Sequence, residues 1–409
     1  MLDIRFIRNN SEEVKLLCKK RGVSVDVDKL VSLDKELNVT KSDLDQKRNE
    51  ANNLIGPENR EKAKELKPII AELKERVNSL QEERDRLWAE LPNLIADDTP
   101  EGRDDEDNVE LQKWGEMPNF AFKPKAHDEI GADLDILDLQ RGTKVSAAGF
   151  YYWKGDGARL VWAVYHLAMD FLVERGFEIM MTPILAKKRT FFGTGYLPFG
   201  EEELYKLEKE ELYLIGTSEQ TLVAYHDDEI IPVSSLPRCY TAFTPCFRTE
   251  AGSYGRKSKG AFRVHQFHKV EQIIFCHPEE SEKWHLECQK NIEDFMQLLG
   301  LPYRVVRVCL GDMGAPGYKK YDVEGWFAGF DEYRETHSNT NLLDFQTRRL
   351  NIRCKEEGAT FYPHTISSTM VTDRAVLAII ENNQQADGSI IIPEVLRKYM
   401  NGQEKIIKK

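Results

Sequence analysis

Mostly apolar positions recur at alternating steps of three and four residues in two stretches of the first hundred residues. The first stretch contains Leu30, Leu33, Leu37, Thr40, Leu44, Lys47, Ala51 and Leu54. The second stretch contains Leu66, Ile70, Leu73, Val77, Leu80, Arg84, Leu87 and Leu91. This spacing places the side chains on one stripe of a helix and is typical of a coiled coil. The pattern therefore predicts two long helices.

A short segment between the two stretches predicts a reversal of the chain. In Ile55-Gly56-Pro57-Glu58-Asn59, Gly56 suits the end of a helix and Pro57 suits a first helical turn. The two helices, each roughly 38 Å long at 1.5 Å per residue, are expected to form an antiparallel coiled-coil hairpin over about 27–95. We expect its distal half to project as an arm from an N-terminal domain, residues 1–100. Pro68 lies inside the second stretch and predicts a kink or a later helix start.

The pattern changes after the hairpin. Residues 101–125 are rich in acidic residues, Pro and Gly and have no period, which predicts a linker. From 126 to 409, strand-like apolar runs at 212–215, 238–243, 270–275 and 303–309 alternate with a few amphipathic helices, of which the longest candidate is 158–174. Because strands dominate, we predict an α+β domain with an antiparallel sheet flanked by helices.

Composition and charge narrow the function classes. The net charge of −12 over 409 residues argues against non-specific coating of nucleic acid, so we expect no DNA binding and only local RNA contacts. The N-terminus carries charges throughout, and no run approaches the ~20 apolar residues of a membrane helix. Seven scattered cysteines lack metal-ligand spacing, which predicts reduced thiols in a cytoplasmic protein and no zinc.

The segment 244–275 carries the candidate chemistry. Arg248 and Glu250 alternate on one face of a strand-like stretch, and Arg263 and Phe267 follow after a Gly-rich turn. Between 251 and 270 there are five basic residues and no acidic ones: Arg256, Lys257, Lys259, Arg263 and Lys269. Arginine forks bind phosphate oxygens, and an aromatic face can stack on a base. Spacing alone also fits a basic hairpin tip with a core phenylalanine, so both interpretations stay open at this point.

Specific motifs extend the nucleotide interpretation. F-R-x-E, a Gly- and Arg-bearing loop and R-x-H-Q-F-x-K-V-E together resemble motif 2 of the class II aminoacyl-tRNA synthetases, in the form found in seryl-tRNA synthetases. The helix before Gly176 with the strand ending at Pro183 resembles motif 1, the dimer-forming element. LIGTSEQT at 214–221 resembles the family's serine-binding segment, ETHSNTNLLDFQTRR at 335–349 resembles a second family signature, and 364–400 resembles motif 3. The resemblance covers almost the whole chain.

The resemblance implies an ATP site with Mg²⁺. Arg248 would bind the α-phosphate, where charge builds in the transition state, and Glu250 would accept from the adenine amino group. Phe267 would stack on adenine, Arg263 would hold the distal phosphates, and Arg374 would press on the opposite side of the nucleotide. Further ATP contacts would come from Thr249, Val264, His265, Gln266, Thr336 and His337. Glu335 and Ser338 would supply oxygens for Mg²⁺.

The resemblance also implies a serine pocket. Its residues would be Thr217, Ser218, Glu219, Arg248, Glu271 and Thr369. Thr369 would meet the serine hydroxyl, and a pocket with buried hydroxyl partners rejects alanine because those partners would be left unpaired. Taken singly, Thr217 could be a helix cap, and the glutamates could be surface or salt-bridged carboxylates.

Some positions depart from the family pattern. Four residues separate Thr369 from Arg374 where the family usually has five, and Asp373 stands where a small residue is more typical. Ser367 replaces the usual Asn, and His337 replaces Ser.

The resemblance implies that the protein is a homodimeric serine–tRNA ligase that charges tRNA(Ser), with tRNA(Sec) left open as a second substrate. The alternatives are an amino acid:carrier protein ligase, which would not need the hairpin, and a non-catalytic tRNA-binding regulator, which the shortened motif 3 would favour.

Overall fold

The structure is a computed structural model that describes residues 1–54, 56, 59–250, 260–356 and 358–409. Arg256, Lys257 and Lys259, and most of the turn predicted between the two long helices, lie outside the described residues. The chain divides into two compact units, Met1–Leu94 and Ile95–Lys409, and each is described by itself.

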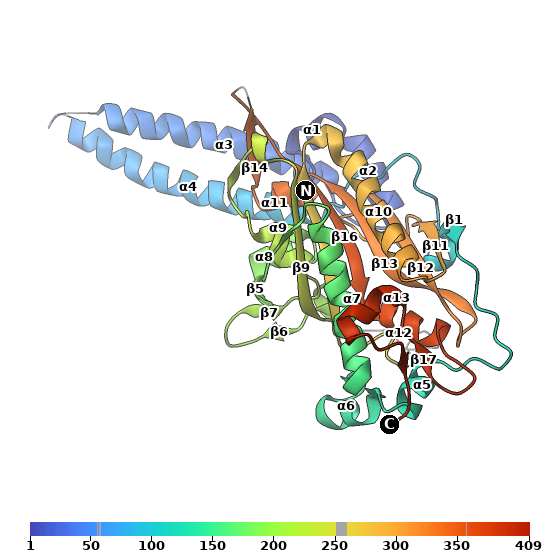
Figure 1. Cartoon of the computed structure of the whole chain (residues 1–409). Coiled ribbons are helices and arrows are strands. Elements are labelled where there is room, and N and C mark those ends of the chain that lie inside the picture. The colour runs from blue at the N-terminus through green and yellow to red at the C-terminus, as the bar shows by residue number, and fades with distance from the viewer. Residues whose placement is uncertain (55, 57–58, 251–259, 357) are drawn as a thin grey trace. The chain divides into compact units, whose positions relative to one another are not determined.

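The first unit is helical. Two short helices, α1 (Ile4–Asn9) and α2 (Ser11–Lys20), precede two long ones, α3 (Val27–Asn53) and α4 (Arg60–Ala89). The long helices run antiparallel as a hairpin, with apolar heptad residues buried between them (Figure 1). The predicted hairpin is confirmed. Of the two outcomes predicted for Pro68, a later helix start is wrong, because α4 begins at Arg60 and contains Pro68 in its interior.

One polar position in the hairpin seam has an electrostatic explanation. Asp34 of α3 is buried, and its carboxylate forms an ion pair with Arg8 Nε at 3.1 Å and accepts a hydrogen bond from Arg84 Nη1 at 3.2 Å. A buried charge is tolerated only when it is paired and hydrogen-bonded. Arg84 therefore fills a heptad position of α4 as the partner of Asp34, and Arg8 ties α1 to the hairpin.

The second unit is built on an eight-stranded sheet (Figure 1). All neighbouring strands pair antiparallel except β4 and β9, which are parallel. In spatial order the strands are β1 (Val109–Trp114), β11 (Tyr303–Arg307), β12 (Lys319–Phe327), β13 (Glu332–Leu343), β16 (His364–Thr372), β10 (Gln266–Cys276), β9 (Arg238–Phe247) and β4 (Glu178–Ile179). The predicted antiparallel sheet is confirmed. The outer strand β1 lies inside the stretch predicted as a linker, and all six of its residues are exposed, including Val109, Leu111 and Trp114.

Helices cover both faces of this sheet. On one face, α7 (Gly155–Val173), α10 (Ser281–Leu298) and α12 (Asp373–Asn382) share the largest apolar core with strand residues such as Val270 and Ile274. On the other face, α9 (Glu219–Ala224) packs over a smaller core that includes Ile273 and Phe275. The longest helix predicted in this unit, 158–174, is confirmed as α7.

Short elements complete the unit. The remaining helices are α5 (His127–Asp133), α6 (Leu139–Ser146), α8 (Lys188–Thr194), α11 (Phe345–Arg349) and α13 (Glu394–Arg397). The remaining strands are β2 (Leu137–Asp138), β3 (Tyr152–Trp153), β5 (Leu185–Lys187), β6 (Lys206–Leu207), β7 (Leu212–Leu214), β8 (Ile230–Pro232), β14 (Arg353–Glu356), β15 (Ala359–Phe361), β17 (Ile390–Ile391) and β18 (Lys405–Ile406).

Strand alternation explains where a polar site can form on the sheet. Successive side chains of a strand point to opposite faces, so Phe267, Lys269, Glu271, Ile273 and Phe275 of β10 share one face. The last two belong to the smaller core under α9, whereas the first three lie beyond it. The polar side chains of Lys269 and Glu271 therefore lie next to this core, on the same face of the sheet and nearer the start of β10.

Candidate active site

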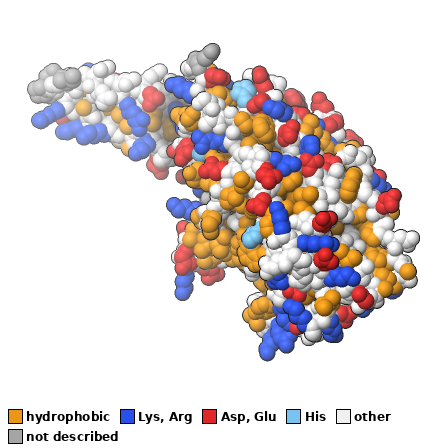
Figure 2. Space-filling view, in the orientation of Figure 1, with side chains coloured by type: hydrophobic (Ala, Val, Ile, Leu, Met, Phe, Trp, Pro, Cys, Tyr) orange, Lys and Arg blue, Asp and Glu red, His pale blue; other side chains and the backbone are white. Residues whose placement is uncertain are grey.

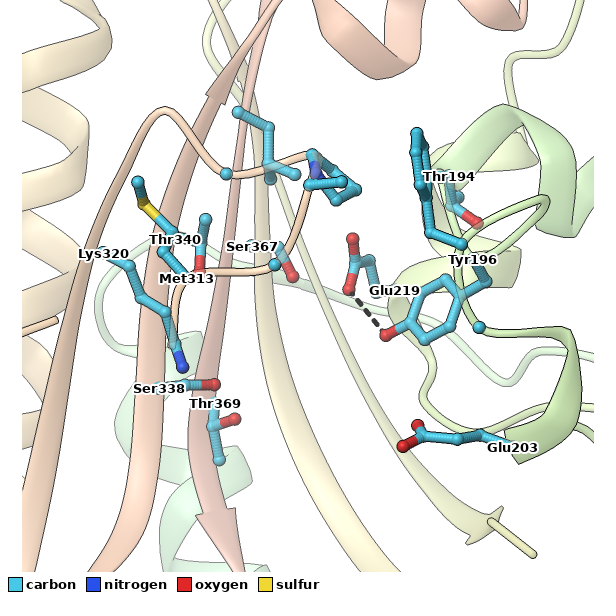
Figure 3. Close-up of a pocket in the computed structure, with 18 of the residues that line it drawn as sticks. Thr194, Tyr196, Glu203, Glu219, Met313, Lys320, Ser338, Thr340, Ser367 and Thr369 are labelled. Atoms are coloured by element: carbon cyan, nitrogen blue, oxygen red, sulfur yellow. Dashed lines mark hydrogen bonds between the residues drawn. The ribbon is translucent and has the colours of Figure 1, made fainter. Parts of the chain in front are cut away.

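Two cavities lie next to each other on this face, with volumes of about 570 Å³ and 110 Å³, called here the larger and the smaller cavity. Among the described residues, four line both of them: Arg248, Lys269, Ser338 and Thr369. Figure 3 shows the larger cavity, with Ser338, Thr369 and Lys320 on one side and Tyr196, Glu219 and Glu203 on the other. A molecule spanning both cavities would pass Arg248.

The sheet itself sets the positions of the shared residues. Ser338, Thr369 and Lys269 come from the neighbouring strands β13, β16 and β10, which are spaced ~4.8 Å apart. Arg248 directly follows β9, and its backbone N–H still donates to the carbonyl of His265 at 3.0 Å. The hairpin pairing thus extends one residue past the strand and fixes the backbone of Arg248.

The smaller cavity is lined by cations and aromatic rings. The Arg248 guanidinium lies 5.4 Å from the centre of the Phe267 ring, and that of Arg374 lies 4.4 Å from the centre of the Phe262 ring. Arg263 forms an ion pair with Glu250. Aromatic faces that stack on a base, combined with arginine forks for phosphate, are what a nucleotide requires.

Glu335 is one of the acidic residues that line the smaller cavity, together with Glu250 and Asp373. Burial alone would raise the pKa of this carboxyl, but the positive charges of Arg374 and Lys320 outweigh burial and lower the pKa to about 2. Arg374 Nη1 lies 2.9 Å from Glu335 Oε2. Glu335 is therefore ionised at neutral pH and offers anionic oxygen to the cavity.

A β-bulge turns Glu335 and Ser338 to the same side. Residues three apart on a regular strand face opposite sides. The register between β12 and β13 shifts where Val323 pairs with His337 but Glu324 pairs with Glu335, so Thr336 is an extra residue. Both oxygen-bearing side chains consequently line the smaller cavity.

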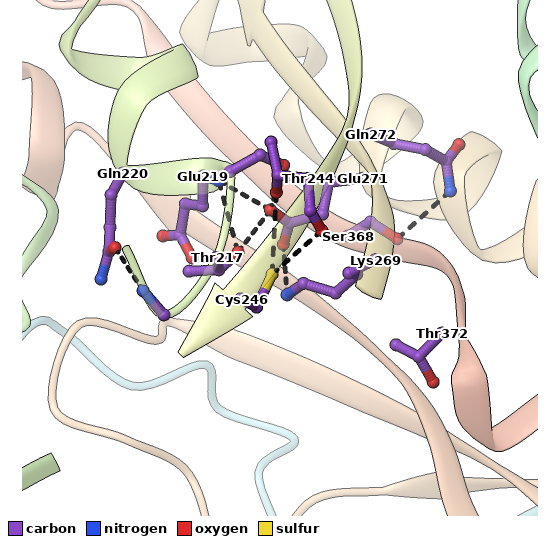
Figure 4. Close-up of polar contacts among 12 residues, drawn as sticks. Thr217, Glu219, Gln220, Thr244, Cys246, Lys269, Glu271, Gln272, Ser368 and Thr372 are labelled. Atoms are coloured by element: carbon purple, nitrogen blue, oxygen red, sulfur yellow. Dashed lines mark hydrogen bonds and ion pairs between the residues drawn. The ribbon is translucent and has the colours of Figure 1, made fainter. Parts of the chain in front are cut away.

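Glu271, which lines the larger cavity, is the centre of a network of polar contacts (Figure 4). Its Oε2 accepts from the hydroxyls of Thr217 and Ser218, the latter at 2.6 Å, and from the backbone N–H of Glu219 at 2.6 Å. Its Oε1 pairs with Lys269 Nζ at 2.5 Å. Burial opposes ionisation of Glu271, but Lys269 and these donors together lower its pKa. The network thus holds a buried glutamate in its charged form.

Glu219, at the start of α9, is a second buried glutamate of the larger cavity. Gln346 Nε2 donates to its Oε1 at 2.6 Å, and the Tyr196 hydroxyl donates to its Oε2 at 3.3 Å. Burial and then the negative charge of Glu271 raise the pKa of Glu219 to about 6, against the opposing effect of Lys269. Two adjacent carboxylates in one cavity suit a substrate with a cationic group.

The shortened motif 3 still brings Arg374 into the smaller cavity. β16 ends at Thr372, whose hydroxyl caps α12 by accepting from Arg374 N at 3.2 Å. Asp373, the unusual residue of this motif, is buried and accepts from the hydroxyls of Tyr151 and Tyr165, each at 2.6 Å. Asp373 is therefore a partnered buried carboxylate at the helix start next to Arg374.

Most of the predicted site residues come together. The predicted residues that line one or both cavities are Glu219, Arg248, Glu250, Arg263, Val264, Phe267, Glu271, Glu335, Thr336, His337, Ser338, Thr369 and Arg374. Five predicted residues are outside both linings as the structure describes them: Thr217, Ser218, Thr249, His265 and Gln266. The hydroxyls of Thr217 and Ser218 donate hydrogen bonds to Glu271. Gln266 lines a separate cavity with aromatic residues, among them Tyr165. Direct substrate contacts of these five residues stay predictions.

Several lining residues were not predicted from the sequence. Lys269 could have been found, because it alternates with Phe267 and Glu271 on one face of a strand. Tyr196, Lys320 and the 312–317 loop carry no such signal, since they reach the larger cavity from distant segments. Gly195 shows how closely these segments approach, because a Cβ there would lie 2.5 Å from Pro316.

Metal ligation and membrane crossing are considered for the described residues 1–54, 56, 59–250, 260–356 and 358–409. In that part of the chain, no group of three or more His, Cys, Asp or Glu side chains is arranged to hold a metal ion. None of its helices combines the length and the apolar character that crossing a bilayer requires.

Known proteins resemble the chain along its whole length. Residues 1–97 match the family model described as the seryl-tRNA synthetase N-terminal domain, and residues 204–383 match the tRNA synthetase class II core domain (G, H, P, S and T). A serine–tRNA ligase from Rubrobacter xylanophilus is 41% identical over 420 residues, covering 99% of each chain. A serine–tRNA ligase from Treponema denticola is 41% identical and covers 98% of each chain.

Solved structures give the same result. A seryl-tRNA synthetase from Pyrococcus horikoshii, crystallised with ATP, matches with a TM-score of 0.92 and 36% identity, covering 100% of both chains. A cytoplasmic serine–tRNA ligase from Naegleria fowleri in complex with AMP matches with a TM-score of 0.88 and 31% identity, covering 100% of this chain and 99% of the other.

Proposed function

The chain belongs to the seryl-tRNA synthetase family, and on that basis we propose that its larger cavity binds serine and its smaller cavity binds ATP. The family resemblance and the class II fold predicted from the motifs are confirmed. The activity is that of an ATP-dependent serine–tRNA ligase, which forms seryl-adenylate and then transfers the seryl group to tRNA. The observation that carries the assignment of the cavities is Arg248, which lines both of them.

Activation joins the two substrates beside Arg248. The ionised glutamates Glu271 and Glu219 bind the serine ammonium group, which directs the serine carboxylate toward Arg248. A carboxylate oxygen attacks the α-phosphorus in line, the new P–O bond forms, and the bond to pyrophosphate breaks. The Arg248 fork stabilises the charge that builds on the α-phosphate oxygens. No side-chain nucleophile is needed.

The smaller cavity holds the nucleotide. Phe267 stacks on adenine, Glu250 accepts from its amino group, and Arg263 and Arg374 hold the phosphates. The ion pair between Arg263 and Glu250 and the pairing of Arg374 with Glu335 keep these arginines at the cavity before ATP arrives. Each arginine exchanges part of its pairing for phosphate oxygens on binding.

Glu335 and Ser338 fit a magnesium site. The bulge in β13 turns both toward the smaller cavity, and Glu335 is ionised at neutral pH. Mg²⁺ usually keeps water and phosphate ligands and needs only one or two protein oxygens, so these two residues suffice. When bound, Mg²⁺ neutralises phosphate charge and orients the phosphate chain.

The second substrate is tRNA, and the helical hairpin is its binding element. Near the free end of α4, four basic side chains are exposed: Arg60, Lys62, Lys64 and Lys67. Figure 2 shows blue side chains along this helix. In a chain of net charge −12 such a local cluster suits the phosphate backbone of an RNA. The substrate is tRNA(Ser), and tRNA(Sec) is the open second candidate.

A homodimer forms through α7 and β4. β4 is an outer strand of the sheet, and an unpaired strand edge is a ready site for pairing with another chain. Trp162 and Val173 of α7 and Ile179 and Met181 at β4 are exposed, Met181 at 99%. Figure 2 shows hydrophobic side chains gathered over the region of α7 and β9. Exposed apolar patches of this kind are typical of protein interfaces.

Cytoplasmic location and catalytic competence complete the proposal. All seven cysteines are free thiols, as expected in a reducing compartment. A carrier-protein ligase would not need the N-terminal hairpin. A non-catalytic regulator would not need to keep Arg248, Glu271 and Glu335 at connected cavities.

Serine-dependent exchange of pyrophosphate into ATP, measured against a panel of amino acids, tests the proposed function. We expect exchange with serine and little with alanine or threonine. If exchange depends on a different amino acid, that amino acid and not serine is the substrate of the larger cavity. Absence of exchange with every amino acid would favour the regulator.

A further inference from the structure

Gln346 and Tyr196 each contact one oxygen of Glu219, a buried glutamate of the larger cavity that lies outside the Lys269–Glu271 ion pair. Gln346 Nε2 is 2.6 Å from Oε1, and the Tyr196 hydroxyl is 3.3 Å from Oε2. We propose that Gln346 and Tyr196 are positioning residues that fix the Glu219 carboxylate for the ammonium group of the amino acid. This inference rests on the proposed function, because it assigns Glu219 to substrate binding.

A third hydrogen bond determines which way the Gln346 amide points. Thr365 Oγ1 donates to Gln346 Oε1 at 2.8 Å, so the amide carbonyl faces β16 and the NH₂ group faces Glu219. The same NH₂ group donates to the carbonyl of Thr194 at 3.2 Å. Gln346, Thr365 and Thr194 are all buried, Gln346 completely. One amide thus links β16, Glu219 and the segment that carries Tyr196.

The charges around Glu219 make this arrangement necessary. From β10, Glu271 repels the Glu219 carboxylate and Lys269 attracts it, while Ser367 of β16 and Gln346 of α11 are neutral donors. Burial and Glu271 raise the pKa of Glu219 to about 6, and the donors oppose that rise because they stabilise the ionised form. Without the Gln346 donor the pKa would rise further. Protonated Glu219 has lost the charge that attracts an ammonium group.

Steady-state exchange kinetics with the full-length protein test the inference. Gln346→Leu removes the amide at similar volume, and Tyr196→Phe removes only the hydroxyl. We expect the serine KM to rise roughly ten- to a hundredfold in Gln346→Leu and less in Tyr196→Phe, with the ATP KM unchanged. In both variants the acidic limb of kcat/KM for serine should move to higher pH. The pH profile distinguishes positioning from a merely structural role.

The matched control is Gln272→Leu. Gln272 is an equally buried glutamine, but its amide contacts Asn291 and Ser368 instead of Glu219. Its substitution should leave the pH profile unchanged. If Gln346→Leu does not fold, Tyr196→Phe must still shift the acidic limb. If the wild-type protein is active but the acidic limb of kcat/KM for serine stays in place in every folded variant, this inference is overturned and the proposed function is not. If the wild-type protein shows no exchange, both are overturned.

Discussion

Arg248 lines both cavities, and we propose that the two substrates meet beside it. Burial lowers the pKa of its guanidinium, but the neighbouring groups of Tyr196, Cys246, Glu203 and Glu250 outweigh burial, and the net shift is upward. The side chain therefore stays charged while it is partly shielded from water. A cation held in this way needs no reorganisation when charge builds on the phosphate.

Replacing Arg248 tests this role. Arg248→Ala should lower the rate of serine-dependent exchange by about 10²–10³-fold, the cost of losing a preorganised donor to the transition state. Arg248→Lys should be intermediate, because a lysine keeps the charge but loses the planar fork. Arg238→Ala, at the opposite end of β9, is the control and should retain near wild-type exchange. Equal rates for Arg248→Ala and the control would remove Arg248 from catalysis.

Residues of the site differ in how well the sequence predicts them. Arg248, Glu250 and Phe267 can be identified because a motif places them together. The strand alternation predicted for Arg248 and Glu250 is wrong, because β9 ends at Phe247 and both residues follow it. Gln346 and Tyr196 cannot, because their partner Glu219 lies 127 and 23 residues away along the chain. Gln346 lies inside the family signature at 335–349, but the signature does not say which carboxylate its amide will contact.

At the scale of elements, the junction of β16 and α12 decides whether the divergent motif 3 still works. Met370 is an extra residue in β16, since Thr369 pairs with Glu271 and Val371 pairs with Val270. This bulge lets Thr369 and Thr372 both line the smaller cavity. Asp373 then fixes the start of α12 through Tyr151 and Tyr165.

Substituting Asp373 tests the junction. Burial would raise the pKa of this carboxyl, but His268 and the two tyrosines outweigh burial and lower it. A lowered pKa means that the stabilisation is present above about pH 4, the usual pKa of Asp, and is lost as pH falls through the lower folded value. Asp373→Asn should therefore reduce the free energy of unfolding by about 1–3 kcal/mol at pH 7, and by less at pH 3.5.

Urea unfolding at the two pH values measures this difference. Tyr151→Phe and Tyr165→Phe, which each remove one donor to Asp373, should show smaller losses at pH 7. An Asp373→Asn loss that is the same at both pH values would contradict a role for the carboxylate charge.

Elements were predictable where one periodicity dominates. The heptad stripes of α3 and α4 and the apolar runs of the central strands follow from spacing alone. β1 and the bulges in β13 and β16 do not, because β1 is a short exposed edge strand directly after an acidic run and a bulge leaves no periodic trace. Both bulges turn site residues toward the smaller cavity, so the irregular positions of the sheet are the ones that serve the site.

At the scale of the whole molecule, we expect the two compact units to divide the two reaction steps. Both cavities belong to the second unit, and the hairpin belongs to the first. Glu36 pairs with Arg76 across the hairpin, and Lys29 pairs with Glu83. In this register Thr40 of α3 and Glu72 of α4 lie at similar positions along the hairpin, so a short linker can connect them. A variant without residues 41–71, closed by a short Gly linker, keeps the proximal half of the seam.

This shortened variant should retain wild-type pyrophosphate exchange and lose tRNA charging by at least about a hundredfold, as expected when several phosphate contacts are removed. Initial rates of exchange and of aminoacylation on one preparation measure both steps. A parallel loss of both steps would contradict the division between the units.

The dimer prediction also belongs to the whole molecule. Trp162→Glu places a charge on the exposed face of α7 and should convert a dimer to monomers in sedimentation velocity experiments. Leu286→Glu on α10 is the control, because Leu286 is exposed to a similar extent, 50% against 53% for Trp162. A protein that is monomeric without any substitution, or a Trp162→Glu variant that stays dimeric, would contradict an interface on α7.

The most direct measurement is a crystal structure of the protein with a non-hydrolysable analogue of seryl-adenylate. The analogue should lie with its adenine on Phe267, its phosphate mimic against Arg248, and its ammonium group between Glu219 and Glu271. An analogue bound elsewhere, or one whose phosphate mimic does not contact Arg248, would contradict the assignment of the two cavities to one reaction.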